Sequence, residues 1–240
     1  MPLGRFHEIS LATPDIRASV EFYEALGFTQ APTMDVWPHP YGVLTDGRLF
    51  IGLHQRDAPS PCVTFVMPDV AAHLSELARL GIELTVCRTA EEVFNEIGFL
   101  APCGQAVRGI EARTYSPVAR DAAEVSLCGY FAEISVPARD FAAARTFWEP
   151  LGFVAAEQTE SPFPRLALTS DHIDIAFHHP ETFAAPLLVF RDRAMRERIA
   201  RLRELALTLS SDVPRGLEPS SAALLKSPEG MRLLLMEGED

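Results

Sequence analysis

The chain has 240 residues, of which 48% are hydrophobic and 22% are charged, and its formal net charge at neutral pH is −12. This composition can bury a sizeable core and excludes an intrinsically disordered chain. The strong negative charge argues against nucleic acid and anionic membrane surfaces as partners, because both attract basic patches.

The sequence carries no sign of export or of membrane insertion. No apolar run reaches the roughly 18–20 residues that a membrane-spanning helix needs, and the opening MPLGRFHE contains no hydrophobic signal core. The four cysteines have no CxxC-like spacing, which argues against a zinc knuckle and favours a reducing compartment. We therefore expect a cytoplasmic protein of bacterial type.

The chain contains a long internal repeat. FHEISLATPDIRASVEFYEALGF (6–28) returns as FAEISVPARDFAAARTFWEPLGF (131–153), and LTDGRLFIGLHQ (44–55) returns as LTSDHIDIAFHH (168–179). APCGQAVRGIE (101–111) also matches SPEGMRLLLME (227–237). Such a period indicates two copies of one structural unit. We expect domains at 1–118 and 127–240, joined by a polar linker at 119–126.

Each copy opens with a predicted strand and a predicted helix. Residues 8–11 (EISL) alternate polar and apolar side chains, and this period of two predicts a strand. Asp15 is suited to cap the helix that follows, and Gly27 is suited to end it.

The rest of each copy repeats the same order. A long proline-rich loop leads to a hairpin with its turn at Thr45-Asp46-Gly47. CVTFVMPDV (62–70) predicts a strand, VAAHLSELARLG (70–81) a helix, and a last strand follows the turn at 102–104. The chain therefore predicts an α+β fold of four βαβββ modules.

These motifs resemble a known family. DIRASVEFYEALGF (15–28), its recurrence at 140–153 and the Pro-x-Gly turn before a last strand are similar to the vicinal oxygen chelate superfamily. This group contains glyoxalases, bleomycin-resistance proteins and extradiol dioxygenases. The resemblance covers nearly the whole chain as two tandem glyoxalase-like domains. It implies curved mixed sheets, each wrapped around a cup that binds a small molecule.

The resemblance also implies four positions from which metal-dependent members project their ligands. The residues there are Glu8, Gly52, Cys62 and Arg108 in the first half, and Glu133, Ala176, Leu187 and Leu234 in the second. One carboxylate per half cannot hold a divalent cation, and a guanidinium would repel it. The resemblance leaves a divalent metal open, whereas these residues favour a site without one.

Each half also directs a glutamate and a histidine toward the same predicted cup. His54 and His178 each lie two residues beyond the second ligand position and therefore share its face. The pairs Glu8 with His54 and Glu133 with His178 are the candidates for acid–base catalysis. Glu111 would complete a three-ligand metal site with Glu8 and His54, although strand parity turns it away unless a bulge intervenes.

Plainer interpretations exist for the same residues. A histidine at a strand end is often exposed to solvent, and Glu8 could form an internal ion pair with Arg108. Cys62 suits a small buried apolar residue. The loop with Trp37 and His39 could cap the first cup or simply pack against it. The candidate ligand-binding residues are Ser10, Trp37, Tyr41, Cys62, Arg108 and Ser135.

Two functions follow from this reading. The first is a metal-free cup that binds a small organic molecule, with an acidic pocket suited to a cationic or hydrogen-bonding ligand and with catalysis possible. The alternative is a metal-dependent glyoxalase- or dioxygenase-type enzyme for a vicinal-oxygen substrate. Leu187 and Leu234 make the second half the better candidate for an inactive copy. Tandem halves can pair within one chain, so a monomer and a homodimer both fit.

Overall fold

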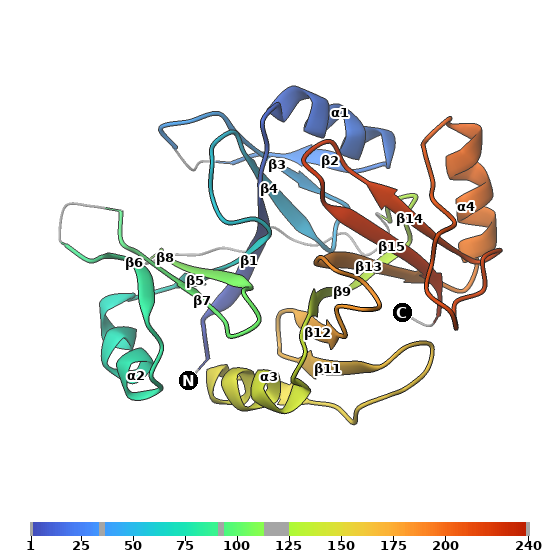
Figure 1. The fold of residues 1–240 in the computed structure, drawn as a ribbon. Coiled ribbons are helices and arrows are strands. Elements are labelled where there is room, and N and C mark those ends of the chain that lie inside the picture. Colours follow the sequence, from blue (N-terminus) through green and yellow to red (C-terminus); the bar gives the residue numbers. More distant parts are fainter. Residues whose placement is uncertain (1, 34–36, 91–93, 113–124, 239–240) are drawn as a thin grey trace.

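The structure is a computed structural model, and it describes residues 2–33, 37–90, 94–112 and 125–238 (Figure 1). The described strands form two mixed sheets, one from each half of the chain. No helix within the described ranges is long and apolar enough to cross a membrane.

The first half forms an eight-stranded sheet in the order β2-β3-β4-β1-β5-β8-β7-β6. Its strands are β1 (Arg5–Ala12), β2 (Thr29–Ala31), β3 (Tyr41–Thr45), β4 (Phe50–His54), β5 (Cys62–Met67), β6 (Leu84–Arg88), β7 (Glu96–Leu100) and β8 (Ala106–Glu111). Its helices are α1 (Ile16–Ala25) and α2 (Leu74–Arg79), the latter preceded by the 3-10 turn η1 (Ala71–His73). β1 runs parallel to β4 and antiparallel to β5, so the two modules join along β1 and β5.

The second half forms a seven-stranded sheet in the order β10-β11-β12-β9-β13-β15-β14. Its strands are β9 (Tyr130–Pro137), β10 (Val154–Ala155), β11 (Arg165–Thr169), β12 (Asp174–His178), β13 (Leu187–Asp192), β14 (Ala222–Lys226) and β15 (Arg232–Glu237). Its helices are α3 (Phe141–Trp148), extended by the 3-10 turn η2 (Glu149–Leu151), and α4 (Met195–Glu204). The predicted α+β class is confirmed, and three of the four predicted βαβββ modules are complete.

The fourth module departs from the predicted pattern. Only two described strands, β14 and β15, follow α4, and the place of a third is taken by an isolated bridge between Ser210 and Leu224. Pro214 and Pro219 lie in the same connection. Proline has no N–H to give to a ladder, which accounts for the short pairing.

The predicted ends of the first helix are confirmed, whereas the helix predicted over 70–81 is shorter, with the 3-10 turn η1 leading into α2 (Leu74–Arg79). The Asp15 side chain accepts hydrogen bonds from the backbone N–H groups of Arg17 and Ala18, and Asp140 accepts one from Ala143 at 2.9 Å. Gly27 ends the first helix with a φ of +89°, a left-handed conformation that suits glycine. These caps fix where each helix leaves its opening strand.

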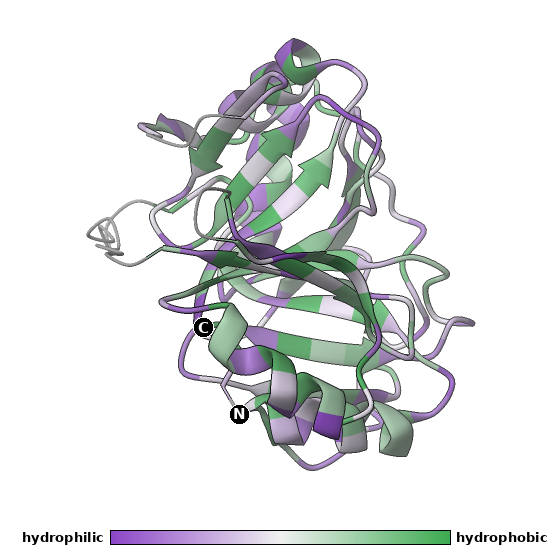
Figure 2. Cartoon of the chain, turned by 90° about the vertical axis from the view of Figure 1, so that its left-hand side faces the viewer, coloured by the Kyte–Doolittle hydropathy of each residue, from purple (hydrophilic) through white to green (hydrophobic). Residues whose placement is uncertain are grey.

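Alternate strand residues divide the molecule into core and cups. Ile9, Leu11 and Ile134 are fully buried in one hydrophobic core that runs through both halves. Figure 2 shows hydrophobic and hydrophilic bands alternating along the strands. Glu8 and Glu133 are buried on the opposite, cup-facing side of their strands.

The two halves pack directly against each other. The Phe28 and Phe190 rings meet edge to face at 6.4 Å. The Tyr23 hydroxyl of α1 donates to Glu229, which lies in the turn between β14 and β15, at 2.6 Å. The predicted domain limits remain a prediction, and most of the linker, 119–124, lies outside the described residues.

Candidate functional site

Glu8 is the centre of the polar network in the first cup. Its side chain is almost fully buried, with Oε1 accepting from the Ser10 hydroxyl at 2.6 Å and Oε2 accepting from the Tyr41 hydroxyl at 2.7 Å. Burial alone would raise the pKa of Glu8, but the hydrogen bond from His54, the charges of His7 and His54 and the Ser10 hydroxyl lower it to about 2. Glu8 is therefore a carboxylate at neutral pH.

The glycine at position 52 makes room for this carboxylate. Gly52 lies opposite Ser10 in the parallel pairing of β4 with β1. A Cβ atom at residue 52 would lie 2.1–2.2 Å from the carboxylate atoms of Glu8. The Glu8 carboxylate thus fills the space that a side chain at the second predicted ligand position would need.

A chain of two imidazoles leads away from Glu8. His54 Nε2 lies 3.2 Å from Glu8 Oε1, and His54 Nδ1 lies 2.9 Å from His39 Nε2. If His54 donates to the carboxylate, it accepts from His39, and His39 Nδ1 is left as a proton acceptor. Burial and the charges of Arg56, His54 and Arg108 lower the pKa of His39, so its neutral form is favoured.

His54 itself is buried, with 3% of its surface exposed, so the alternative of a solvent-exposed strand end is wrong. Its ring centroid lies 4.6 Å from that of Tyr41 and 5.3 Å from that of Trp37. The loop residues Trp37 and His39 therefore cover the predicted Glu–His pair. Five predicted site residues meet here: Glu8, Ser10, Trp37, Tyr41 and His54.

Arginines make up the other side of the first cup. Arg108 forms an ion pair with Glu96 through both Nε, at 2.8 Å, and a second guanidinium nitrogen. Arg88 also reaches Glu96, at 3.0 Å. Arg108 thus pairs with Glu96, and the alternative pairing with Glu8 is wrong. Its guanidinium also stacks 4.6 Å from the Trp37 ring centroid.

A pocket of about 170 Å³ opens between these two groups. Its remaining walls are largely apolar, and its polar lining comes from Ser10, His54, Arg56, Cys62, Thr85, Arg88, Glu96 and Arg108. Burial raises the pKa of the Cys62 thiol to about 12. A thiol with that pKa stays protonated at neutral pH and is a poor nucleophile.

The sequence patterns did not predict several of these pocket residues. Glu96 and Arg88 face each other across the β6–β7 pairing, and Arg56 lies two residues after the end of β4. An acidic residue at the start of the otherwise apolar EIGFL strand was the available signal for Glu96.

The second cup keeps the polar residues but gives them other partners. Glu133 forms an ion pair with Arg165, with Nε donating to Oε1 at 2.8 Å. His178 Nδ1 lies 2.7 Å from the Ser135 hydroxyl, and its Nε2 lies 3.1 Å from the Phe183 carbonyl. Burial lowers the pKa of His178 to about 4. The predicted Glu133–His178 pair is therefore divided between two separate contacts.

Apolar side chains fill the second cup. They form a separate buried cluster of Phe163, Phe183, Leu187, Val189, Ala222, Leu234 and Met236. Leu187 and Leu234 are completely buried in it. A cup packed in this way is a small hydrophobic core and leaves its polar residues a structural role.

The fold was compared with known proteins. No protein-family model and no curated protein matches the sequence. A crystal structure of catechol 2,3-dioxygenase is similar with a TM-score of 0.63 and 15% identity, over 100% of this chain and 89% of that chain. The Mn(II)-bound glyoxalase from Novosphingobium aromaticivorans has a TM-score of 0.65 and 13% identity, over 97% of this chain and 81% of that chain. A homoprotocatechuate 2,3-dioxygenase variant from B. fuscum in complex with HPCA has a TM-score of 0.66 and 15% identity, over 100% of this chain and 72% of that chain.

The chain has the vicinal oxygen chelate fold. The coverage of these structures confirms, across both halves, the fold that the sequence motifs predict. At 13–15% identity the likeness shows the fold, and the chemistry has to be argued from the side chains.

The metal positions of the vicinal oxygen chelate fold do not carry a fitting donor set here. Glu8 stands alone, Gly52 offers no ligand, Cys62 holds its proton and Arg108 contributes a guanidinium, which repels a cation. Glu111 accepts from the Val70 N–H at 3.0 Å and from Asn95, so it does not join Glu8 and His54. Among the described residues no three His, Cys, Asp or Glu side chains are grouped for a metal.

Proposed function

We propose that this protein binds a small organic molecule in the pocket of the first cup, without a resident metal ion, and that Glu8, His54 and His39 can exchange a proton with it. The observation that carries the proposal is the contrast between the cups. The first has a pocket with polar walls, and the second fills the corresponding space with apolar side chains.

The size of the pocket supports a small ligand. Its volume of about 170 Å³ lies below the roughly 300–1,000 Å³ of sites for drug-sized molecules. A single ring or a short chain is the right scale. The neighbours in fold point the same way, since two of them are named for catechol and homoprotocatechuate.

The histidine chain supports proton exchange. Glu8 is ionised and orients His54, and His54 in turn orients His39. A neutral imidazole held in this way is a general base that can return its proton later in a reaction. Glu8 and His39 act as positioning residues in this arrangement, because His54 is the member of the chain that lines the pocket and would meet the ligand.

A blocking variant tests the proposal. Gly98 lines the pocket, and a Cβ there would make only ordinary contacts, the nearest at 3.4 Å to Val86. Gly98→Leu copies the second cup, where Leu224 pairs with β15 as Gly98 pairs with β8. The matched control is Leu224→Met. Metal-stripped protein is screened against one-ring and short-chain molecules by thermal shift, and hits are measured by calorimetry.

We expect saturable binding to the wild type and to Leu224→Met, and loss of binding in folded Gly98→Leu. Equal binding to Gly98→Leu would place the ligand elsewhere. Binding that appears only when a stoichiometric transition metal is restored, and that Glu8→Gln abolishes, would favour the alternative, a metal-dependent glyoxalase- or dioxygenase-type enzyme.

A further inference from the structure

The charges around the first-cup pocket differ in sign from those of the whole chain. The chain carries a formal net charge of −12, yet three arginines and a single carboxylate, Glu96, line the pocket. Glu8 is not among the residues that line the pocket, and Ser10, Tyr41 and His54 already contact its carboxylate. The expectation of an acidic pocket for a cationic ligand is therefore wrong.

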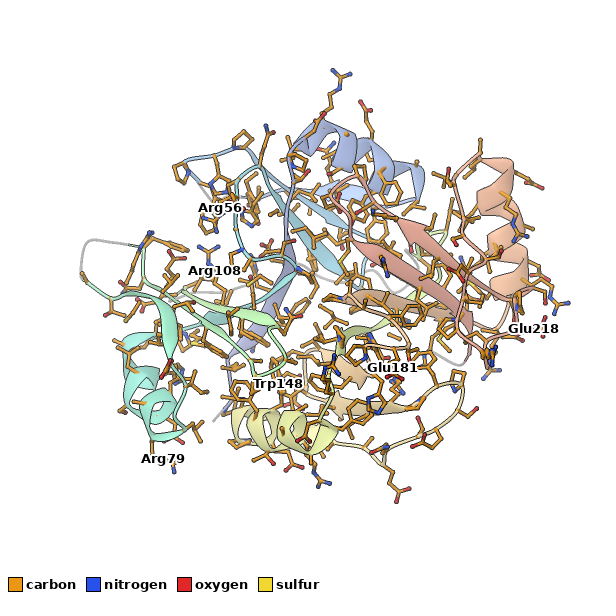
Figure 3. The ribbon with its side chains drawn as sticks, in the orientation of Figure 1. Arg56, Arg79, Arg108, Trp148, Glu181 and Glu218 are labelled. Atoms are coloured by element: carbon orange, nitrogen blue, oxygen red, sulfur yellow. The ribbon has the colours of Figure 1, made fainter. Side chains whose placement is uncertain are left out.

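The three guanidinium groups differ in whether a carboxylate pairs with them. Glu96 serves both Arg88 and Arg108. Arg56 has no carboxylate partner among the described residues, and its aromatic contact is the Trp37 ring, 5.8 Å away. Burial and the positive charge of Arg108 lower the pKa of Arg56. Figure 3 labels Arg56 and Arg108 near each other, and both residues line the pocket.

Apolar surface is exposed beside these charges. Val86 and Leu100 are among the few large hydrophobic residues that the described chain exposes, at 38% and 49%, and both line this pocket. Exposed apolar side chains that converge on a pocket mark a binding surface. A bare inorganic anion would leave these side chains wet, whereas a ligand with an apolar body would cover them.

We infer that the pocket takes a small organic carboxylate, with its charged group between Arg56 and Arg108 and its apolar body against Val86 and Leu100. The inference rests on the proposed function and names the class of ligand. Guanidinium groups bind carboxylates strongly and directionally. Arg56 contributes its unpaired charge, while Glu96 and Trp37 hold Arg108 in place.

Matched pairs of ligands test the charge. Benzoate is compared with benzyl alcohol, and hexanoate with 1-hexanol, because each pair shares its apolar body. Inorganic phosphate serves as the bare anion. We expect each carboxylate to bind the wild type at least about 10-fold more tightly than its alcohol. Phosphate should give no saturable binding at the same concentration.

Arg56→Gln tests the residue, and Arg79→Gln is its control. Arg79 lies on α2, is exposed and pairs with Glu76, and its loss changes the net charge by the same amount. Arg56→Gln should weaken carboxylate binding about 10-fold and leave alcohol binding within about twofold, whereas Arg79→Gln should change neither.

The outcomes separate this inference from the function on which it rests. If the alcohols bind as tightly as the carboxylates and Gly98→Leu blocks both, the pocket binds ligands but the carboxylate inference is wrong. If phosphate binds as tightly as benzoate, the site selects bare anions and the inference is also wrong. If Gly98→Leu weakens the binding of none of the compounds, both the proposed function and the carboxylate inference are wrong.

Discussion

Arg108 and Gly98 face the pocket of the first cup, whereas Leu234 and Leu224 stand at the corresponding places of the second. The correspondence follows from the pairing, because Gly98 lies opposite Arg108 between β7 and β8, and Leu224 lies opposite Leu234 between β14 and β15. One backbone plan thus supports either an open polar site or a closed apolar core. The choice depends on a few cup-facing side chains.

The glutamates are the feature that the cups share. Tyr41 and Arg165 both pair across a hairpin with the cup histidine of their half. Tyr41 gives Glu8 a hydroxyl, whereas Arg165 gives Glu133 a full opposite charge. A buried acid on the opening strand is therefore compatible with both kinds of cup. Its partners, more than the acid itself, distinguish a candidate site from a structural ion pair.

The largest effect is expected from moving one first-cup charge into the second cup. Leu234→Arg would bury a guanidinium among Leu187, Val189 and Phe183. An unpaired buried charge costs several kcal/mol, so we expect a loss of more than about 4 kcal/mol of unfolding free energy, or no folded protein. Urea denaturation measures it.

Two further variants sharpen this result. Leu234→Met keeps the volume and the apolar character, and should cost less than about 1.5 kcal/mol. Adding Ala222→Glu to Leu234→Arg recreates the Glu96–Arg108 pair, because Ala222 corresponds to Glu96 in strand register. It should restore part of the lost stability. A Leu234→Arg protein as stable as the wild type would show that the second cup admits water.

The pH dependence of the unfolding free energy should show two ranges, one from a histidine of the second cup and one from the glutamate of the first. His178 has its pKa lowered from 6.5 to about 4, so the unfolded chain takes up a proton first and stability falls as the pH drops from 6.5 to 4. Glu8 has its pKa lowered from 4.5 to about 2, so its contribution is present above 4.5 and is lost between 4.5 and 2. Each loss is about 3 kcal/mol.

Urea denaturation across this pH range checks the two windows. His178→Gln should remove most of the fall between pH 6.5 and 4, leaving the part that His39 contributes, and should keep the lower window in place. Glu8→Gln should remove the lower window and keep the upper one. His172→Gln, at an exposed hairpin turn, serves as the control and should leave both windows unchanged. If His178→Gln retains the whole loss between pH 6.5 and 4, the burial of His178 does not cause it.

Much of the fold could be predicted from the sequence because its signals are local. The repeat, the Asp15 cap and the alternation in residues 8–11 each lie within one element, and they set the modules and the faces. The third strand of the fourth module failed as a prediction because the repeat was extended over a connection that contains Pro214 and Pro219.

The site was only partly predictable, because its partners are brought together by register between distant strands. The positions of Glu8 and His54 followed from strand parity. The pairing of Glu96 with Arg108 depends on the β7–β8 register, and the contact of His39 with His54 depends on a loop path. The filling of the second cup by Phe163 and Phe183 comes from loops that have no periodicity to read.

The smallest effect is expected at the position that separates the cups most subtly, Gly52 against Ala176. Gly52→Ala would place its Cβ within 2.2 Å of the Glu8 carboxylate, which Ser10, Tyr41 and His54 hold in place. We expect overpacking to cost about 1–2 kcal/mol. In a Glu8→Ala background the same change should cost almost nothing, because the obstructing atoms are gone. Chemical denaturation of the four proteins gives the coupling energy.

Ala176→Gly, in the second cup, should cost about 0.5–1 kcal/mol through backbone entropy and show no coupling to Glu8. An additive cycle at residues 8 and 52 would mean that the carboxylate moves aside freely, and the first cup would then lack the rigid acid on which its histidine chain depends.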